Sequence, residues 1–480
     1  MPETPERQFR ANAYPYLAGL ARPLGWRVSW RALGVRYNPT LRYTLEPDDL
    51  KLLLAEAKRL KPDVVVVNER LAPRQLAALK ARVRYCPLGE DFPAHFAAFV
   101  RTVDPAAPAA VLDDPDLLET IEPEFPREVL NSAPWAAHPL MRVVAGARCS
   151  YQTLADDNPF YRGLKLPAAA MPCSFCGTPA RDEGVRDPVA FAARHIEAAA
   201  RRRGASDAEL RFELIGARLW RRLEDFVAEL VRRGVRGAEL SFMPRIDEIL
   251  EAREVLRRCL PALAERGLAL RLYGAGVENF SPDENARLNK GITAEQVHEA
   301  AAFIAETRTR WPHAFRFPDG KLSMILFTPW TTLADLRVNI DHIERCPLIC
   351  ARAVLGSRLQ LFPGRPVALL AEKDGLLAKK RKDGFYNSGC IVSADQSEIP
   401  WRFARPEVGL LHELGRGLVQ HYYGERRADG PQARALAAAA AAAEARSPKP
   451  LAAFRRAVET LERRPRTRSL PQLLTLMLQS

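Results

Sequence analysis

The sequences GARCSY at residues 146–151 and PCSFCG at residues 172–177 hold the three cysteines on which the interpretation of fold and site depends. Cys149 comes first, 23 residues separate it from Cys173, and two residues separate Cys173 from Cys176. Three thiolates without an obvious fourth are typical of an iron-sulfur cluster in which one iron stays open for a substrate or cofactor. A C-x2-C pair alone also fits half of a zinc site, a redox dithiol or chance, so the rest of the sequence has to decide.

The sequence around these cysteines predicts a partial barrel of parallel strands. From about residue 141 to residue 365, short apolar segments alternate with helical patterns, and residues 223–231 carry apolar side chains at the spacing of a helix packed on a sheet. Six such units predict a partial (β/α)6 barrel of the TIM type, whose chemistry lies at the carboxyl ends of the strands. All three cysteines follow the first strand, where an active site is expected. The predicted strands are residues 142–147, 211–216, 237–242, 269–273, 322–327 and 356–361.

The sequence before the barrel predicts a smaller α/β unit at residues 13–110. Helical patterns at Tyr14–Leu24 and Asp48–Leu60 alternate with apolar segments at Trp26–Trp30 and Val64–Val67. A continuous β-branched run is typical of a buried parallel strand. We therefore expect a partial doubly wound, Rossmann-like domain.

Two further segments complete the predicted organisation. Residues 111–140 are rich in proline and acidic residues, which predicts a linker or a wrapping arm. Residues 366–480 are predicted to form a helical C-terminal extension, because Ala435–Ala443 is nearly all alanine and alanine favours helix while burying little. The basic run Arg463–Arg468 precedes an apolar end, and we assign this extension no chemistry.

Length, charge and cysteine usage narrow the class of protein. A chain of 480 residues is too long for one ordinary core, so several globular units are expected. Eight scattered cysteines are too few for a disulfide framework and favour reduced thiols or metal ligation. The net charge of +13 comes from arginines dispersed over many predicted helices, so we interpret it as biased composition and consider a nucleic-acid partner the weaker alternative.

Targeting signals and other catalytic motifs are missing from the sequence. No apolar run approaches the roughly 18 residues of a membrane span, and Met1–Arg10 is polar with no apolar core behind it, so we expect a cytoplasmic protein without membrane anchor. The eight histidines form no H-x-x-x-H or H-x-x-E-H arrangement, and no G-x-x-x-x-G-K-[ST] loop occurs. Zinc hydrolase and nucleoside triphosphatase functions therefore lack support.

Segments around the last three predicted strands carry further distinctive sequence. They are GVENFS at 276–281, LNKGIT at 288–293, LFTPW at 326–330 with Asp335, and RLQLFPG at 358–364 with KDGLL at 373–377. Together with GARCSY and CSFC, and in this order, they resemble the radical S-adenosylmethionine superfamily, and within it the branch with an N-terminal cobalamin-binding-like domain. The resemblance spans roughly residues 13–390.

This resemblance implies a chemistry for the three cysteines. Cys149, Cys173 and Cys176 would bind three irons of a [4Fe-4S] cluster, and the fourth iron would take the amino and carboxylate groups of S-adenosylmethionine. Reductive cleavage of that cofactor would give a 5′-deoxyadenosyl radical that abstracts hydrogen from a substrate. The implied partners are a small-molecule or peptide substrate and an electron donor such as flavodoxin or ferredoxin.

The resemblance also implies contacts to the bound cofactor. Glu278 and Ser281 would touch its methionine or ribose part, and Phe175 would pack near the adenine. Each has a plainer interpretation: Ser281 followed by Pro282 also fits the start of a helix, and Phe175 also fits simple core filling.

Two features depart from the family pattern. The family usually has three residues between its first two cysteines, whereas this chain inserts Thr153–Pro172 before Cys173. The insertion is expected to lie beside the cluster, with residues 158–161 near the substrate, and it leaves open whether Cys149 is a ligand. The family's D-x-H-x-x-G cobalamin signature is absent from the N-terminal domain, which speaks against bound cobalamin.

Three functional interpretations therefore remain. The first is a radical S-adenosylmethionine enzyme, with or without cobalamin-dependent methyl transfer. The second is a catalytically degenerate scaffold of the same fold, and the third is a basic zinc protein that contacts nucleic acid. Of the other candidates, Cys346, Cys350 and Cys390 are expected to be inert thiols, and Glu213 and Glu239 are expected to pair with arginines inside the barrel.

Overall fold

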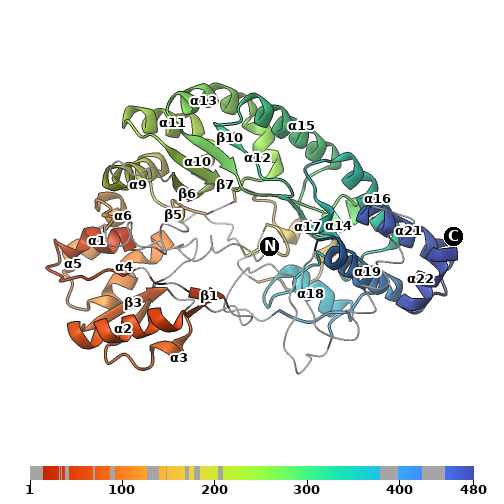
Figure 1. The fold of residues 1–480 in the computed structure, drawn as a ribbon, viewed down its shortest axis with the longest axis horizontal. Coiled ribbons are helices and arrows are strands. Elements are labelled where there is room, and N and C mark those ends of the chain that lie inside the picture. Colours follow the sequence, from red (N-terminus) through yellow and green to blue (C-terminus); the bar gives the residue numbers. More distant parts are fainter. Residues whose placement is uncertain are drawn as a thin grey trace.

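The chain folds into a mixed α/β protein with parallel strand pairs and many helices, which confirms the predicted α/β class, while the doubly wound domain and the partial barrel stay predictions. Figure 1 shows an arc from the red N-terminal helices over the green helices of the middle to the blue C-terminal helices. Met1–Arg10, Cys390 and Ala435–Ala443 lie outside the residues that the computed structural model describes. Those are residues 14–31, 33, 35–37, 43–68, 71–86, 92–126, 140–147, 149–167, 172–177, 184–203, 209–378, 398–423 and 449–479.

A five-stranded parallel sheet forms the centre of the molecule. Its order is β10-β8-β7-β6-β5, so that β5 to β8 lie side by side in chain order. These four strands confirm the first four predicted ones, each within a few residues. The strands are β5 (Leu140–Val144), β6 (Leu210–Ile215), β7 (Ala238–Phe242), β8 (Ala269–Leu272) and β10 (Phe315–Arg316).

The fourth predicted strand continues beyond β8 and changes partner. After Tyr273 and Gly274 the chain resumes as β9 (Ala275–Glu278), which pairs in parallel with β11 (Leu322–Met324). The next strand along the chain is divided in the same way: its first part, β10, pairs with β8, and its second part, β11, pairs with β9. The predicted strand 322–327 is thus shorter than expected.

The sixth predicted strand, 356–361, is wrong as a regular strand. Its residues form only isolated bridges, a parallel one between Phe327 and Arg358 and an antiparallel one between Leu361 and Ile399.

The two faces of the central sheet differ in polarity, because successive side chains of a strand point to opposite sides. Apolar residues such as Val143, Phe212 and Leu240 are fully buried in the main core. The other face carries charge: Arg142 Nε donates to Glu213 Oε2 at 2.9 Å, and Glu239 pairs with three arginines. The predicted arginine pairing of both glutamates is confirmed.

Helices cover the apolar side of the sheet, as Figure 1 shows for its outer rim. They are α9 (Pro188–Arg203), α10 (Ala217–Arg221), α11 (Leu223–Arg232), α12 (Ile246–Glu251), α13 (Arg253–Glu265) and α15 (Ala294–Arg310). The predicted helical stripe is confirmed in α11, where Leu223, Phe226, Val227 and Leu230 are buried.

The N-terminal part contains helix α1 (Tyr14–Ala21), an antiparallel pair and a parallel pair. The predicted run Val64–Val67 lies in β3 and pairs in parallel with β4, but it is half-buried rather than buried. One parallel pair joined by a helix is a βαβ unit, which agrees with the α/β prediction. The remaining elements are β1 (Val35–Tyr37), β2 (Tyr43–Leu45), α2 (Pro47–Leu60), β3 (Val64–Asn68), α3 (Pro73–Leu76), β4 (Arg82–Cys86) and α4 (Phe92–Val103).

The predicted strand Trp26–Trp30 is wrong. The segment pairs with no strand among the described residues, and Val28 is 43% exposed. Trp26 instead packs partly against the core and donates its indole N–H to Asp104 at 2.7 Å. An apolar pattern produces a strand only where a neighbour can complete the hydrogen-bond ladder.

The segment predicted as a linker packs against both of its neighbours where it is described. It contains the short helix α6 (Leu117–Thr120), and Phe125 is buried beside Tyr14 and His195. Glu124 N donates to Pro15 O, which ties the segment to α1. The description of a wrapping arm therefore fits better than that of a free linker.

The described C-terminal part is mainly helical, as predicted. Helices α19 and α21 pack on each other, and α21 also packs on α16. None of the described helices is long and apolar enough to span a membrane. The domain boundaries at 110, 140 and 365 stay predictions. The helices are α16 (Leu333–Arg345), α17 (Ala351–Val354), α18 (Pro366–Lys373), α19 (Pro406–Tyr423), α21 (Pro450–Arg463) and α22 (Leu470–Gln479).

Candidate functional site

The fold brings the three predicted cysteines together at the carboxyl end of the central sheet. Cys149 follows β5, and Cys173 and Cys176 share a tight turn in which Cys176 N donates to Cys173 O at 3.1 Å. Cys173 is buried, and its thiol interacts electrostatically with those of Cys149 and Cys176. The 23 residues between the first two cysteines therefore do not separate them in space.

Three cationic side chains surround these thiols. Arg245, in the loop after β7, lies with Nη1 3.7 Å from Cys173 Sγ and has its guanidinium stacked 4.0 Å from the ring centre of Tyr151. Lys290 is buried and interacts with the same thiol. Arg365 lies against Gly177 and interacts with Cys176, so every thiol has a cation in its surroundings.

Burial has a larger effect on the pKa values of two of the thiols than the neighbouring cations have. Burial raises the pKa of Cys173 to about 12, although Lys290 and Arg245 act in the opposite direction. Burial also raises the pKa of Cys149. Three thiols with cationic side chains beside them are a donor set that fits an iron-sulfur cluster, in which each deprotonated thiolate would bind its own iron.

In the part of the chain that the structure describes, no three Cys, His, Asp or Glu side chains are grouped so as to hold one metal ion. Cys346 and Cys350, predicted to be inert, are free thiols, and burial raises the pKa of Cys346.

Arg245 also connects the loops on both sides of the cysteines. Its Nη2 donates to Lys290 O at 2.7 Å, and its Nε donates to Asp247 at 2.9 Å. Glu248 accepts from Arg245 N at 2.8 Å and from the hydroxyl of Ser150, next to Cys149. The start of α12 thereby holds the loop that carries the first thiol.

Glu278, a predicted cofactor contact, lies at the end of β9 and is paired with Lys290. Its backbone has φ = 63°, and its Oε1 accepts from Lys290 Nζ at 3.0 Å. The carboxylate folds back over Gly276, so a side chain at Gly276 would overlap Oε1 and come within 3.0 Å of Nζ. Gly276 is therefore required for Glu278 and Lys290 to meet beside Cys173.

We expect Gly276→Ala to break this pair and to destabilise the protein by about 1–3 kcal/mol, as overpacking of a buried site does. The midpoint of thermal unfolding would report the loss. Gly274→Ala is the matched control, because its added methyl group meets Met243 Sδ at an ordinary 3.6 Å. Equal midpoints for the two variants would contradict the role assigned to Gly276.

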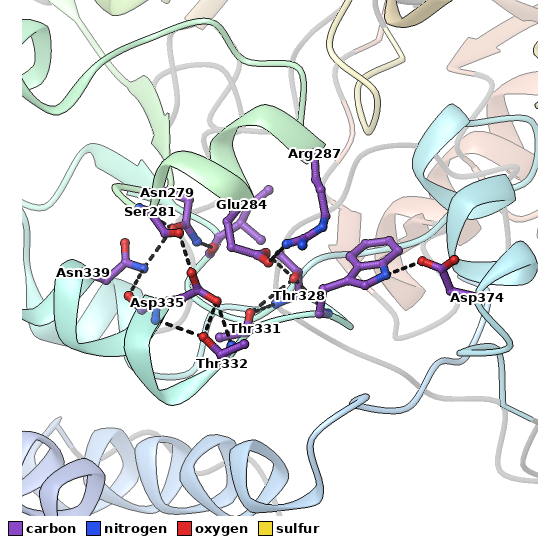
Figure 2. A network of polar contacts seen from close by, with 12 residues as sticks. Asn279, Ser281, Glu284, Arg287, Thr328, Thr331, Thr332, Asp335, Asn339 and Asp374 are labelled. Atoms are coloured by element: carbon purple, nitrogen blue, oxygen red, sulfur yellow. Dashed lines mark hydrogen bonds and ion pairs between the residues drawn. The ribbon is translucent and has the colours of Figure 1, made fainter. Parts of the chain in front are cut away.

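Ser281, the second predicted cofactor contact, belongs to a network that joins the fourth and fifth strands. Figure 2 shows its hydroxyl directed to Asp335, which also accepts from the N–H and hydroxyl of Thr332. Asn279 Oδ1 accepts from Ser281 N and from Asn339 Nδ2. Two segments quoted from the sequence, 276–281 and 326–330 with Asp335, thus meet in space.

Ser281 also precedes helix α14 (Pro282–Arg287), with Pro282 at its first position. The predicted helix start is confirmed, but the Ser281 side chain makes no capping bond to this helix. Contact of Glu278 and Ser281 with a cofactor stays a prediction. Phe175, predicted to lie near the adenine, is half-buried against a second core cluster that contains Leu288, Leu361 and Trp401.

Glu284 on α14 is a functional candidate that the sequence did not reveal. It is fully buried, accepts from the Thr328 hydroxyl and pairs with Arg287, as Figure 2 shows. Burial raises the pKa of its carboxyl to about 7, although Thr328 and Arg287 lower it in part. A proton therefore stays on this carboxyl well above its ordinary pKa of 4.5.

This raised pKa predicts a pH dependence of stability. Because the folded-state pKa lies above the unfolded one, the protonated Glu284 contributes stability that is complete below pH 4.5 and is lost as the pH rises through about 7. We expect Glu284→Gln to weaken the dependence of the thermal midpoint on pH between pH 5 and about 8, because the variant no longer has this titrating group. Glu265→Gln, an exposed glutamate on α13, is the control; an unchanged slope in Glu284→Gln would refute the assignment.

Of the cationic residues at the thiols, Lys290 lies in a segment that the sequence analysis singled out, whereas nothing in the sequence marked Arg245 as part of the site. Arg245 follows β7 in the run Met243-Pro244-Arg245, and one arginine among many in this chain does not stand out. Only the meeting of the loops after β5, β7 and β9 shows that it faces a thiol.

Comparison with solved structures identifies the fold of the chain. No protein-family model and no curated protein matches the chain. Among solved structures, the cobalamin-dependent S-adenosylmethionine radical enzyme OxsB with aqua-cobalamin bound is similar over 89% of this chain and 72% of its own, with a TM-score of 0.54 and 12% identity. Its apo, selenomethionine-labelled form covers 90% and 76%, with a TM-score of 0.47 and 12% identity. The chain thus has the fold of a cobalamin-dependent radical S-adenosylmethionine enzyme.

Proposed function

We propose that this protein is a radical S-adenosylmethionine enzyme. The observation that carries the proposal is the convergence of Cys149, Cys173 and Cys176 at the carboxyl end of the parallel strands, in a fold similar to that of OxsB. The carboxyl ends of parallel barrel strands are where such folds place their chemistry. The substrate is proposed to be a small molecule or a peptide.

The residues of the site have separate roles in this proposal. The three thiolates hold a [4Fe-4S] cluster, which when bound supplies the electron that cleaves S-adenosylmethionine to a 5′-deoxyadenosyl radical. Arg245 places a cationic donor 3.7 Å from Cys173 Sγ, and charge and hydrogen bonds at sulfur set the potential of such clusters.

The cofactor would lie against the loops after β9 and β11. Glu278 and Ser281 would contact its methionine or ribose part, as the resemblance implies, and Phe175 would lie near the adenine. The pairing of Glu278 with Lys290 fixes the direction of the carboxylate before any ligand binds. The electron would come from a flavodoxin or ferredoxin, and the site of action would be the cytoplasm.

The proposal is tested by cofactor cleavage. The protein is reconstituted anaerobically with iron and sulfide, then mixed with dithionite and S-adenosylmethionine, and 5′-deoxyadenosine is measured. We expect product from the wild type and none from Cys173→Ala/Cys176→Ala. A bound cluster without product in the wild type would favour the degenerate scaffold or a missing substrate or partner. Bound zinc with a colourless protein would favour the nucleic-acid-binding alternative.

Cobalamin-dependent methyl transfer is a second candidate, favoured by the likeness to an enzyme structure with aqua-cobalamin bound. The missing D-x-H-x-x-G signature argues against it. Visible spectra distinguish cobalamin-dependent methyl transfer from a cobalamin-free reaction. The protein is incubated with hydroxocobalamin and desalted, and its spectrum is then recorded. Retained corrinoid absorption would support methyl transfer, and its absence would support a cobalamin-free reaction.

A further inference from the structure

The two ends of the inserted segment Thr153–Pro172 are held by one side chain. Asn289 Nδ2 donates to Thr153 O at 2.8 Å and also to Pro172 O. These two carbonyls belong to the first and last residues of the insertion, and Cys173 follows directly. A single amide group therefore joins the points at which the insertion leaves and re-enters the loop of the cysteines.

The same side chain accepts from the insertion. Asn158 Nδ2 donates to Asn289 Oδ1 at 3.0 Å and to Ala286 O at 2.6 Å. Asn289 is 7% exposed, and its backbone has φ = 49°, a conformation that asparagine tolerates better than most residues. Both ends of its amide are thus used, and its backbone is suited to the position.

The carbonyls at the end of α14 hold the rest of this region. Arg287 O accepts from the hydroxyls of Tyr161 and Ser174, and Leu288 O accepts from Ser174 N at 3.1 Å. The last carbonyls of a helix have no partner within the helix. Here the insertion and the Cys173 turn provide those partners, so both are fixed to the same helix end.

The two residues after Asn289 contact the loop of the first thiol. Lys290 O accepts from Arg245, whose guanidinium covers Tyr151. Gly291, at φ = 65°, lies so close to the Tyr151 hydroxyl that no side chain would fit. Residues 289–291 therefore touch the chain on both sides of the insertion.

We propose that Asn289 is a positioning residue that closes the insertion, so that Cys149 and Cys173 meet as they would across a short spacer. This inference rests on the proposed function, in which the two thiols serve one cluster. The Asn289 clasp, meaning the Asn289 amide with the carbonyls of Thr153 and Pro172, holds together by hydrogen bonds the two points that a short spacer would join directly.

The test uses variants of Asn289 that keep its backbone conformation. Asn289→Gly removes the amide but accepts the positive φ, and Asn289→Asp keeps the size but cannot donate to the two carbonyls. Lys61→Gly is the matched control, because Lys61 has the same φ of 49° at the end of α2, far along the chain from the cysteines. Circular dichroism and thermal midpoints show that each variant is folded.

The first measurement needs neither cluster nor cofactor cleavage. Apo protein carrying Cys176→Ala is treated with dibromobimane, which fluoresces strongly when it joins two neighbouring thiols, and the Cys149–Cys173 product is identified by peptide mass. We expect this cross-link in the otherwise wild-type chain and in Lys61→Gly, and we expect it to fall about tenfold in both Asn289 variants, as loss of a residue that orients ligands does.

The second measurement is iron bound after reconstitution of variants that retain Cys176, with the electron paramagnetic resonance signal of the reduced protein. We expect both to fall in the Asn289 variants and to persist in Lys61→Gly. Three results would each overturn the clasp. They are equal cross-linking in Asn289→Gly and the wild type, no cross-link in the wild type, and a fall in Lys61→Gly equal to that in the Asn289 variants. Cross-linking that depends on Asn289, in a protein that never cleaves S-adenosylmethionine, would support the clasp and refute only the proposed function.

Discussion

Replacement of Cys149 by alanine is expected to abolish 5′-deoxyadenosine formation as completely as loss of Cys173. The structure places the Cys149 thiol in interaction with that of Cys173 and beside Arg245, despite the insertion between them. A cluster that has lost one of three protein ligands loses the coordination that keeps it bound. We therefore expect reconstituted iron to fall along with the product, measured by iron analysis and chromatography of the reaction.

The control for this result is Cys259→Ala. Cys259 is a buried free thiol on α13, so its replacement removes a cysteine without touching the site. It should bind iron and form product like the wild type. Full activity in Cys149→Ala would show that the first thiol is not a ligand and would leave the C-x2-C pair to be explained by other chemistry.

Glu213→Ala is expected to destabilise the central sheet strongly. Glu213 is 2% exposed and accepts from Arg142 Nε at 2.9 Å and from the Tyr273 hydroxyl at 2.7 Å. Removal of one partner of a buried ion pair is strongly destabilising and costs about 3–5 kcal/mol. We expect a lower thermal midpoint and faster hydrogen exchange of the amides in β5 and β6.

A double variant compares the effect of removing one partner on thermal stability with the effect of removing both. Arg142→Met/Glu213→Leu removes both charges and fills similar volume, which is often neutral or stabilising at buried pairs. It should recover most of the midpoint lost in Glu213→Ala. A double variant as unstable as the single one would show that the pair itself, with its link to Tyr273, holds the strands in place.

The sequence predicted the elements that depend on local pattern. The parallel strands β5 to β8 and the stripe of α11 follow from apolar periodicity. The first cysteine follows β5, at the carboxyl end of the parallel sheet. The arginine partners of Glu213 and Glu239 could be expected because charged groups are seldom buried unpaired. These predictions needed no knowledge of which loops meet.

The rest depends on contacts between distant segments. Trp26–Trp30 has a strand-like pattern but no neighbouring strand, and the fourth strand breaks at Tyr273 and Gly274, where it changes partner. Arg245 contacts Cys173, which is 72 residues away along the chain, and Asn289 binds Pro172, which is 117 residues away. No local pattern in the sequence encodes such a meeting.

The fastening of both ends of the insertion by Asn289 has a consequence for how proteins of this kind are recognised. A chain segment whose ends are pinned together can grow or shrink between them at little cost, since the entropy of a loop rises only slowly with its length. The number of residues between the first two thiols is then free to vary while their separation in space is not. A search that demands a fixed interval between cysteines would pass over such proteins, whereas one that asks for an amide-bearing residue opposite the interruption would find them.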